Sequence, residues 1–214
     1  MDIALFGATG AIGSLFLIIA LDKGDTVYAY ARNPEKIKIE NDNLHIIKGD
    51  LTDEKAMETA INKADIVIST MGPSMKSKRS DMSTPIADGH SLIIKIMKRL
   101  NKSRLITLAT PSIHADSDPK SALLKIIPFG AKLLYPWAYR DMVKLGIIIK
   151  SANIDWTVIR IMSPNAKSSG NGYDVAVGQD NSKMSVSREN VAKFFYDVAS
   201  KNTFIREMPI VFNR

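Results

Sequence analysis

Three glycines spaced three residues apart follow a short apolar segment near the N-terminus. Gly7, Gly10 and Gly13 form a G-x-x-G-x-x-G pattern between a predicted strand at 2–6 and a predicted helix at 11–23. Backbone N–H groups at the start of a helix bind a pyrophosphate, and side chains inside the turn would block its approach. We expect Gly7 to permit the tight turn, Gly10 the close approach, and Gly13 the packing of helix against strand. Glycines also mark ordinary turns, but these flanking elements are typical of dinucleotide binding.

The predicted second strand ends in Ala31, Arg32 and Asn33, about nineteen residues beyond the last glycine. Sites for NAD usually place a carboxylate here, where it binds the ribose hydroxyls. A guanidinium instead suits the 2′-phosphate of NADP, through paired charge-assisted hydrogen bonds. The sequence therefore predicts NADP as the cofactor, with NAD as the alternative. The competing interpretation of Arg32 is a solvated arginine at a strand end.

These residues lie in a chain of alternating strand and helix patterns. Strands separated by helices of this length imply right-handed crossovers and a parallel sheet covered on both faces. We therefore predict an α/β fold of Rossmann type, a doubly wound parallel sheet that binds ligands at the carboxyl ends of its strands. Strands are predicted at 2–6, 26–31, 44–48, 65–70, 104–109, 156–161, 183–186 and 208–212, and helices at 11–23, 54–62, 84–100, 138–152 and after Ser187, with a short helix opening at Asn33 and Pro34.

The length of 214 residues, with no linker or internal repeat, predicts one domain over 1–214. Three segments that follow strands lack a regular pattern: about 73–83, 112–137 and 164–182. Because loops at the carboxyl ends of the strands lie over the ligand, we expect these segments to form a small substrate lobe.

Composition excludes several classes of function. The chain has no cysteine, which excludes disulfides, catalytic thiolates and zinc–thiolate sites, and no histidine spacing indicates a metal site. The net charge is +7, but lysine and arginine are scattered, so we expect anionic small molecules rather than nucleic acid as ligands. No run approaches the ~20 apolar residues of a membrane span, and no signal peptide pattern is present. We therefore expect a cytoplasmic protein without a membrane partner; no pattern indicates an oligomeric state.

Four stretches of the chain resemble the atypical short-chain dehydrogenase/reductases of the NmrA-like group. They are Ile3-Ala-Leu-Phe-Gly-Ala-Thr-Gly-Ala-Ile-Gly13, Tyr30-Ala-Arg-Asn-Pro34, Gly49-Asp50-Leu51 and Asp155-Trp-Thr-Val-Ile-Arg160. Within that group the chain is most similar to the short members related to biliverdin-IXβ reductase, also called flavin reductase. The resemblance covers nearly the whole chain.

The resemblance implies a set of cofactor contacts at the ends of successive strands. Asp50 has the alternative role of a helix or turn cap, and Gly72 with Pro73 that of a plain turn. The implied contacts are Thr9, Gly10, Ala11 and Ile12 at the pyrophosphate, Arg32 at the 2′-phosphate, Asp50 and Leu51 at the adenine, Thr70, Met71 and Gly72 at the nicotinamide ribose, and Ser163 and Pro164 at the carboxamide.

The chain lacks the Tyr-x-x-x-Lys pair that serves most of this wider superfamily as proton donor. Tyr139 is followed four residues later by Val143, and Lys144 lies five residues away. On a helix these side chains would point about 140° apart. The flavin-reductase-like members also lack the pair, because hydride delivery to a planar acceptor needs mainly proximity and exclusion of water.

We therefore expect an NAD(P)H-dependent reductase of a flavin such as FMN, a quinone or a similar planar acceptor. Thr110, Ser112 and His114 are the candidate catalytic residues, which could orient or protonate the acceptor; the alternatives are loop caps and a surface histidine. His45 and His90 have no suitable partners and are expected to be structural. Two other functions remain open: a non-catalytic NADP(H) sensor of NmrA type with a protein partner, and a nucleotide-sugar epimerase or dehydratase.

Several aromatic and methionine side chains fall in the unpatterned segments. Met75, Phe129, Tyr135, Trp137 and Tyr173 could together form a soft planar site for the acceptor. The alternative is that they simply pack the lobe above the sheet.

Overall fold

The computed structural model describes residues 1–74, 77–120, 122–167, 170–179 and 182–214. Its main sheet contains β1 (Asp2–Phe6), β2 (Thr26–Ala31), β3 (Leu44–Lys48), β4 (Ile66–Ser69), β5 (Arg104–Ala109), β6 (Asp155–Arg160), β8 (Tyr173–Ala176) and β10 (Ile210–Asn213). The strand order is β3-β2-β1-β4-β5-β6-β10-β8. Every neighbouring pair is parallel except β10 and β8. The predicted doubly wound α/β fold is confirmed, with one antiparallel strand added at its edge.

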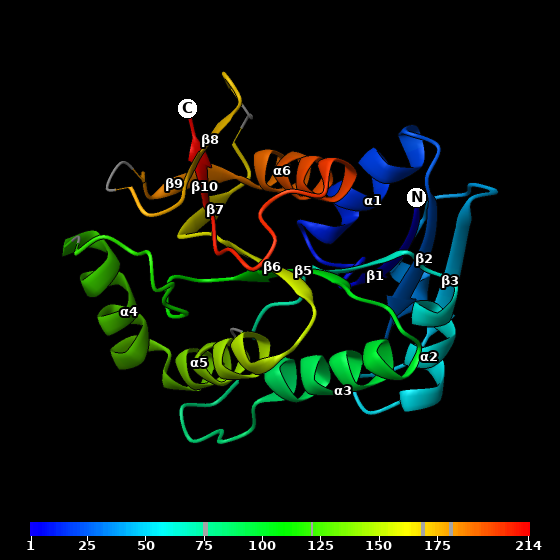
Figure 1. The fold of residues 1–214 in the computed structure, drawn as a ribbon, viewed down its shortest axis with the longest axis horizontal. Helices are drawn as coiled ribbons and strands as arrows, with labels where there is room; N and C mark the ends of the chain where they lie inside the picture. Colours follow the sequence, from blue (N-terminus) through cyan, green and yellow to red (C-terminus); the bar gives the residue numbers. More distant parts are fainter. Residues whose placement is uncertain (75–76, 121, 168–169, 180–181) are drawn as a thin grey trace.

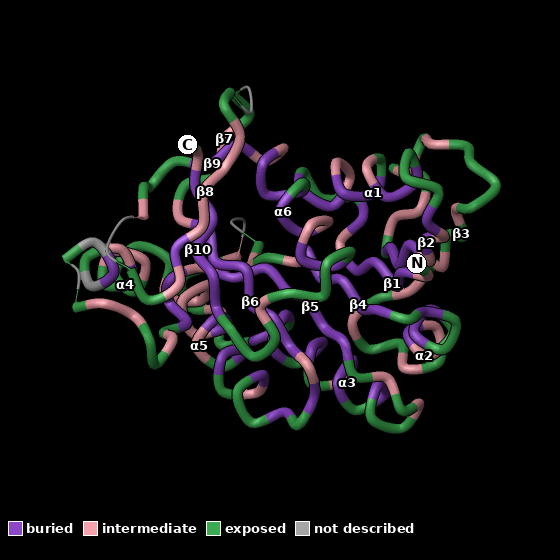
Figure 2. Tube along the Cα trace, turned by 45° about the horizontal axis from the view of Figure 1, so that its top comes forward, coloured by how far each residue is buried: buried purple, intermediate pink, exposed green. Residues whose placement is uncertain are grey.

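Helices cover both faces of this sheet (Figure 1). On one face lie α1 (Gly13–Asp22) and α6 (Arg188–Lys201), and on the other lie α2 (Glu54–Asn62), α3 (Pro85–Arg99) and α5 (Pro136–Ser151). Alternate residues of β1 point to opposite faces, so that Ile3 packs with the first group and Ala4 with the second. The central strands are accordingly buried along their length (Figure 2).

Helix α1 begins at a glycine, Gly13, and a second glycine, Gly24, follows its C-terminal cap. Gly10 to Ile12 belong to the turn after β1, so the helix starts at Gly13 rather than at the predicted residue 11. At the other end, Gly24 has a φ of +79° and its N–H donates to the carbonyl of Leu21, while the N–H of Asp25 donates to that of Ala20. This pair of bonds is the Schellman motif, which ends a helix at the glycine and starts the connection to β2.

The topology creates a crevice beside β1. The chain leaves β1 to form β2 and β3 on one side, and β4, β5 and β6 on the other. The connections on the two sides of β1 therefore diverge, which opens a space at the carboxyl ends of the strands.

The structure adds elements where the sequence showed no pattern. Helix α4 (Ala122–Leu134) lies within the segment expected to be irregular at 112–137. A short strand that was not predicted, β7 (Ser163–Asn165), pairs in a separate parallel sheet with β9 (Ser185–Ser187), which overlaps the strand predicted at 183–186. Among the described residues, no helix has the length and apolar composition needed to cross a membrane.

Candidate functional site

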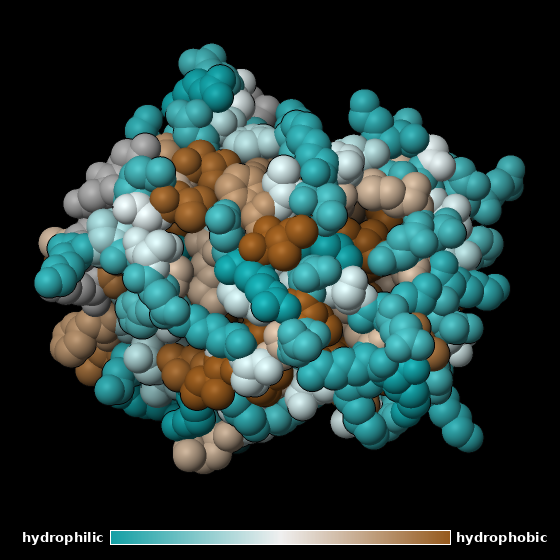
Figure 3. Space-filling model, in the orientation of Figure 1, coloured by the Kyte–Doolittle hydropathy of each residue, from teal (hydrophilic) through white to brown (hydrophobic). Residues whose placement is uncertain are grey.

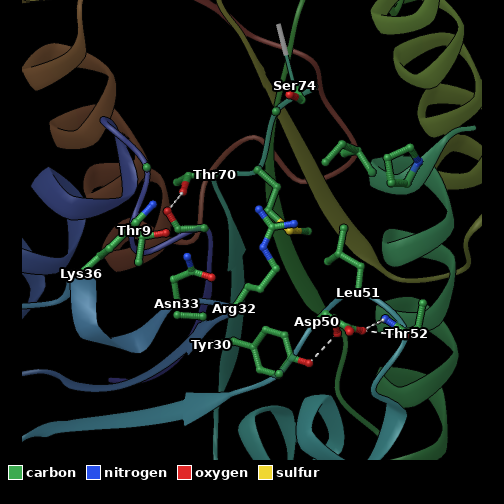
Figure 4. A pocket seen from close by; sticks show the side chains of 18 residues that line it. Thr9, Tyr30, Arg32, Asn33, Lys36, Asp50, Leu51, Thr52, Thr70 and Ser74 are labelled. Carbon is green, nitrogen blue, oxygen red and sulfur yellow. Dashed lines mark hydrogen bonds between the residues drawn. The ribbon is translucent and has the colours of Figure 1, made fainter. Parts of the chain in front are cut away.

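A cavity of about 520 Å³ opens at the carboxyl ends of β1, β2, β3 and β4. Its wall comes from the turn after β1, the ends of β2 and β3, the segment after β4 and the start of α3 (Figure 4). The volume lies within the range of ligand-binding clefts. The lining residues are Gly7, Thr9, Gly10, Tyr30, Ala31, Arg32, Asn33, Lys36, Gly49, Asp50, Leu51, Thr52, Thr70, Met71, Gly72, Ser74, Pro85 and Ile86.

The glycine turn forms one end of this cavity. Gly7 has a φ of +90°, which side chains rarely adopt, and the N–H of Gly10 donates to its carbonyl at 2.9 Å. The hydroxyl of Thr70, at the end of β4, donates toward the carbonyls of Phe6 and Gly7. The turn is therefore held to the neighbouring strand as well as to itself.

The N-terminus of α1 opens on the same end of the cavity. Ile12 is the N-cap residue and is buried, and in the described part of the chain no side chain caps the helix. Thr9, Gly10 and Ala11 are exposed at the tip of the turn. Uncapped N–H groups of a helix attract anions, so the turn has the open access and polarity that a pyrophosphate requires.

Two cations lie at the end of β2. Arg32 and Asn33 follow the strand directly, and Pro34 begins a 3₁₀ turn, η1 (Pro34–Lys36), which ends in Lys36 at the cavity wall. Figure 4 shows Thr9, Asn33 and Lys36 on one side, with Arg32 reaching toward the middle. This group provides two positive charges beside the glycine turn, which suits a second phosphate.

Asp50 is the acidic residue of the cavity wall, and its carboxylate is engaged within its own turn. Oδ1 accepts from the hydroxyl of Thr52 at 2.6 Å and from its N–H at 2.8 Å. These bonds, first that of the hydroxyl, lower the pKa of Asp50. The alternative role of a turn cap is thus what the structure shows for this side chain. The carbonyl of Asp50 accepts from the hydroxyl of Tyr30 at 2.6 Å, which fixes the turn after β3 against β2.

The opposite wall is formed by Met71 and Gly72 after β4 and by Pro85 and Ile86 at the start of α3. A buried carboxylate from α5, that of Asp141, holds the N-terminal end of α3 in place. Asp141 accepts from the N–H groups of Ile86 at 3.1 Å and Ala87 at 2.8 Å. Burial raises the pKa of Asp141, and the two N–H bonds oppose that rise.

The three catalytic candidates lie together in the turn after β5, outside the cavity wall. The hydroxyl oxygen of Thr110 accepts from the N–H of Ser112 at 3.4 Å, Ser112 is buried, and His114 is exposed. The alternative roles of loop cap and surface histidine therefore describe their present contacts. β5 is the neighbour of β4, so this turn lies next to the segment carrying Met71.

A buried ion pair fixes the turn after β5. The guanidinium of Arg160, on β6, donates to both oxygens of Asp118 at 2.6 Å, and to the carbonyl of Ile113 at 3.2 Å. Asp118 also accepts from the N–H of Ala115 at 2.9 Å. The side chain of Arg160 is only 1% exposed, so the contact is shielded from solvent.

Ser163 and Pro164 follow β6 and are exposed. They pair with β9, and the N–H of Ser163 donates to the carbonyl of Met184 at 3.0 Å. Pro164 has no N–H, so neither residue offers an uncommitted backbone donor, and neither lines the cavity.

Among the described residues, the aromatic side chains considered as one of two alternatives to form an acceptor site do not gather at the cavity. Phe129 and Tyr135 are exposed, outside the cavity wall. Trp137 packs edge-on against Tyr135 and donates to the carbonyl of Ser74 at 3.0 Å. Tyr173 lies on β8, where its ring packs against Phe194 of α6. Met75 lies outside the described residues.

Several wall residues were not predicted from the sequence. Lys36 had a signal, because a turn-forming Asn-Pro pair separates it from Arg32. No sequence pattern pointed to Tyr30 or Thr52, since their roles depend on the packing of β2 against the turn after β3. The unpredicted wall residues also include Asn33, Gly49, Ser74, Pro85 and Ile86.

The sequence matches a known protein family. A family described as NAD(P)H-binding matches residues 7–202, which is most of the chain. Over 73 residues the chain is 32% identical to an Arabidopsis thaliana protein named probable pinoresinol-lariciresinol reductase 3. That match covers 32% of this chain and spans only 24% of the plant protein.

Solved structures share the fold at low sequence identity. A short-chain dehydrogenase/reductase from Veillonella parvula, in complex with NADP, has a TM-score of 0.78 at 20% identity, covering 98% of this chain and 93% of its own. ChuY, described as an anaerobillin reductase from Escherichia coli, has a TM-score of 0.77 at 18% identity, with coverages of 100% and 97%.

Proposed function

The chain belongs to the NAD(P)H-binding family, and from this premise we propose that it is an NADP(H)-dependent reductase of a flavin, a quinone or a similar planar acceptor. When bound, the nicotinamide supplies a hydride to the acceptor. The chain's own residues bind the dinucleotide, set its orientation and keep water from the reacting face.

The observation that carries the cofactor preference is the pair of cations at the end of β2. Arg32 and Lys36 line the cavity beside the glycine turn, where an NAD site would hold a carboxylate. On the neighbouring strand end, Oδ1 of Asp50 is occupied by the hydroxyl and the N–H of Thr52. A 2′-phosphate would meet two positive charges, whereas the ribose hydroxyls of NAD would find no free acceptor of comparable strength on β2.

The absence of the Tyr-x-x-x-Lys proton donor from the sequence bears on the kind of acceptor. Lys144 donates to Asp88 at 2.6 Å and to the hydroxyl of Thr84 at 2.9 Å, both at the start of α3. Lys144 is thus engaged at α3, and four residues beyond Tyr139 the chain has Val143 instead of the lysine that would assist proton donation. A planar acceptor that takes its proton from solvent suits this arrangement better than a carbonyl or sugar substrate.

The acceptor would approach between the apolar wall of Met71 and Ile86 and the turn after β5. We assign Thr110, Ser112 and His114 to that approach as the groups that orient the acceptor, on a turn held by Arg160. The names of the reductases among the similar proteins support the same class of chemistry.

The test follows absorbance at 340 nm as NADPH or NADH is oxidised in the presence of FMN and a panel of small quinones. Faster oxidation of NADPH with any of these acceptors supports the proposal. Tight binding of NADPH without oxidation would instead favour a non-catalytic NADP(H) sensor, and the next step would be a search for its protein partner.

A further inference from the structure

Helix α4 exposes an apolar face to solvent. Ile126, Phe129, Leu133 and Leu134 are 66%, 69%, 57% and 62% exposed. At about 100° per residue these four side chains fall within an arc of about 140° on the helix. Leu124 and Pro128 lie on the opposite side of the helix and are buried. The helix is thus apolar on both its inner and its outer face, although an ordinary surface helix is polar on the outside.

The chain around α4 is basic as well as apolar. Residues 119–140 include Lys120, Lys125, Lys132 and Arg140 and contain no aspartate or glutamate. Lys132 and Arg140 line a groove of about 420 Å³ at the end of the helix, together with Tyr139, Val143 and Ile147. Figure 3 shows hydrophobic side chains over α4 and α5 on this side of the molecule.

Aromatic residues gather at the C-terminal end of the exposed face. Tyr135 is 42% exposed, Trp137 is half-buried beside it, and Tyr139 lies within 6.0 Å of the ammonium of Lys132. Tyrosine and tryptophan favour the boundary between lipid and water, because they are apolar with one polar tip.

We propose that the exposed apolar face of α4 docks on an anionic phospholipid bilayer. The apolar side chains enter the interface while the exposed Lys120 and Lys132 meet lipid phosphates, the pattern of an interfacial amphipathic helix. Thirteen residues span about 20 Å, less than the ~30 Å hydrocarbon core, so α4 lies along the surface and does not cross it. The proposal differs from the expectation of no membrane partner, which was drawn from the lack of a spanning segment and of a signal peptide pattern.

Charge distinguishes this occupant from a second copy of the chain. A two-fold contact sets the same patch against itself, so its exposed Lys120 and Lys132 would meet the same cations of the second copy, and residues 119–140 contain no acidic partner for them. An anionic bilayer supplies the opposite charge over the whole face. The proposal does not depend on the proposed reductase activity, because its tests require no nucleotide.

The experiment is co-sedimentation of the full chain with vesicles of phosphatidylcholine, with and without phosphatidylglycerol. We expect binding to the anionic vesicles that weakens in high salt, and much weaker binding to the neutral ones. The double variant Phe129→Ser/Leu133→Ser should lower the partition coefficient about tenfold or more. Both side chains are exposed, so folding should persist, and near-UV circular dichroism checks this.

A matched control replaces equally apolar exposed residues elsewhere. Ile18→Ser/Ile205→Ser, at positions 44% and 42% exposed on other surfaces, should bind vesicles as the wild type does. Brominated lipid should quench the fluorescence of Trp137 but not that of the buried Trp156. The variant Trp137→Phe, which retains only Trp156, should therefore show no quenching. Absence of binding to anionic vesicles, or equal binding by the α4 double variant, would overturn the proposal. Self-association lost in that variant, without vesicle binding, would assign the face to a second copy.

Discussion

Gly13 packs so closely on Gly7 that a Cβ atom at Gly13 would lie 2.1 Å from the Gly7 carbonyl oxygen. The same atom would also lie 2.5 Å from the hydroxyl oxygen of Thr70. At Gly10, by contrast, a Cβ atom would lie 3.2 Å from the Gly7 oxygen, and the residue lines the cavity. The third glycine of the motif therefore serves the fold, whereas the second makes a milder contact with the turn and lies at the cavity, where a ligand can approach it.

This difference predicts opposite effects of two alanine substitutions. Gly13→Ala should destabilise the protein by about 1–3 kcal/mol or more, because the methyl group meets rigid backbone. Gly10→Ala should lower the urea midpoint less than Gly13→Ala does, because its methyl group meets the Gly7 oxygen at the longer distance of 3.2 Å, but it should weaken NADPH and NADH alike, by about tenfold. Urea unfolding and dinucleotide titration measure the two effects. Unchanged binding in Gly10→Ala would show that no phosphate approaches this turn.

The cations at the end of β2 predict a selective loss of NADPH affinity. Arg32→Asp should raise the dissociation constant of NADPH by about a hundredfold, since it removes paired charge-assisted bonds, and that of NADH only slightly. Lys36→Gln should have the same selectivity and a smaller effect, about tenfold. Isothermal titration gives both constants.

The control for Arg32→Asp is Lys201→Asp on α6, which makes the same change of net charge at an exposed site away from the cavity. It should leave both dissociation constants unchanged. A parallel loss of NADPH and NADH affinity in Arg32→Asp would show that Arg32 does not recognise the 2′-phosphate.

The ion pair between Arg160 and Asp118 predicts a large cost for Asp118→Asn. The buried guanidinium would lose its counter-charge, and we expect about 3–5 kcal/mol of destabilisation by urea unfolding. Asp116→Asn, two residues away, removes a carboxylate that is 99% exposed and should not shift the midpoint measurably. Equal midpoints for the two variants would mean that the turn after β5 does not depend on Arg160.

His90 predicts a dependence of stability on pH. Its Nδ1 donates to the carbonyl of Ile86 at 2.7 Å, and its Nε2 accepts from the hydroxyl of Thr107 at 2.8 Å. Burial lowers its pKa from 6.5 to about 4. Between pH 6.5 and about pH 4 the unfolded chain binds more protons at this histidine than the folded chain does. The contribution of the neutral His90 to the free energy of unfolding is therefore complete above pH 6.5 and is lost as the pH falls toward 4.

The measurement compares unfolding free energies at pH 7.5 and pH 5. Wild type should lose about 2 kcal/mol more than His90→Gln over this interval, because the variant lacks the titrating ring. His45→Gln replaces an exposed ring stacked on Tyr28 and should behave as the wild type does. A wild-type slope no steeper than that of His90→Gln would contradict a neutral buried His90.

Much of the fold could be predicted because local patterns and pairing agree. The strands at 2–6, 26–31, 44–48 and 104–109 and the helix at 54–62 have the predicted bounds. Helix α4 could not be recognised, since Pro128 and Gly130 interrupt its pattern and both disfavour a helix interior. Strand β8 is short and gains its hydrogen bonds from β10, which is distant in sequence.

The site was predictable where a residue lies within two residues of the carboxyl end of a strand. Arg32, Asp50 and Met71 all do, and all line the cavity. The support of α3 by Asp141 could not be foreseen, because the carboxylate comes from a helix about 55 residues away and its role depends on how α3 and α5 pack. The engagement of Ser163 by Met184 was likewise hidden, because β7 and β9 show no pattern that would pair them.

The most direct test of the central claim is an equilibrium titration of the unmodified protein with NADPH and with NADH. The two ligands differ only in the 2′-phosphate that Arg32 and Lys36 are proposed to bind. We predict that both bind and that NADPH has the lower dissociation constant, by about tenfold or more. Equal constants, a preference for NADH, or binding of neither ligand would contradict the account.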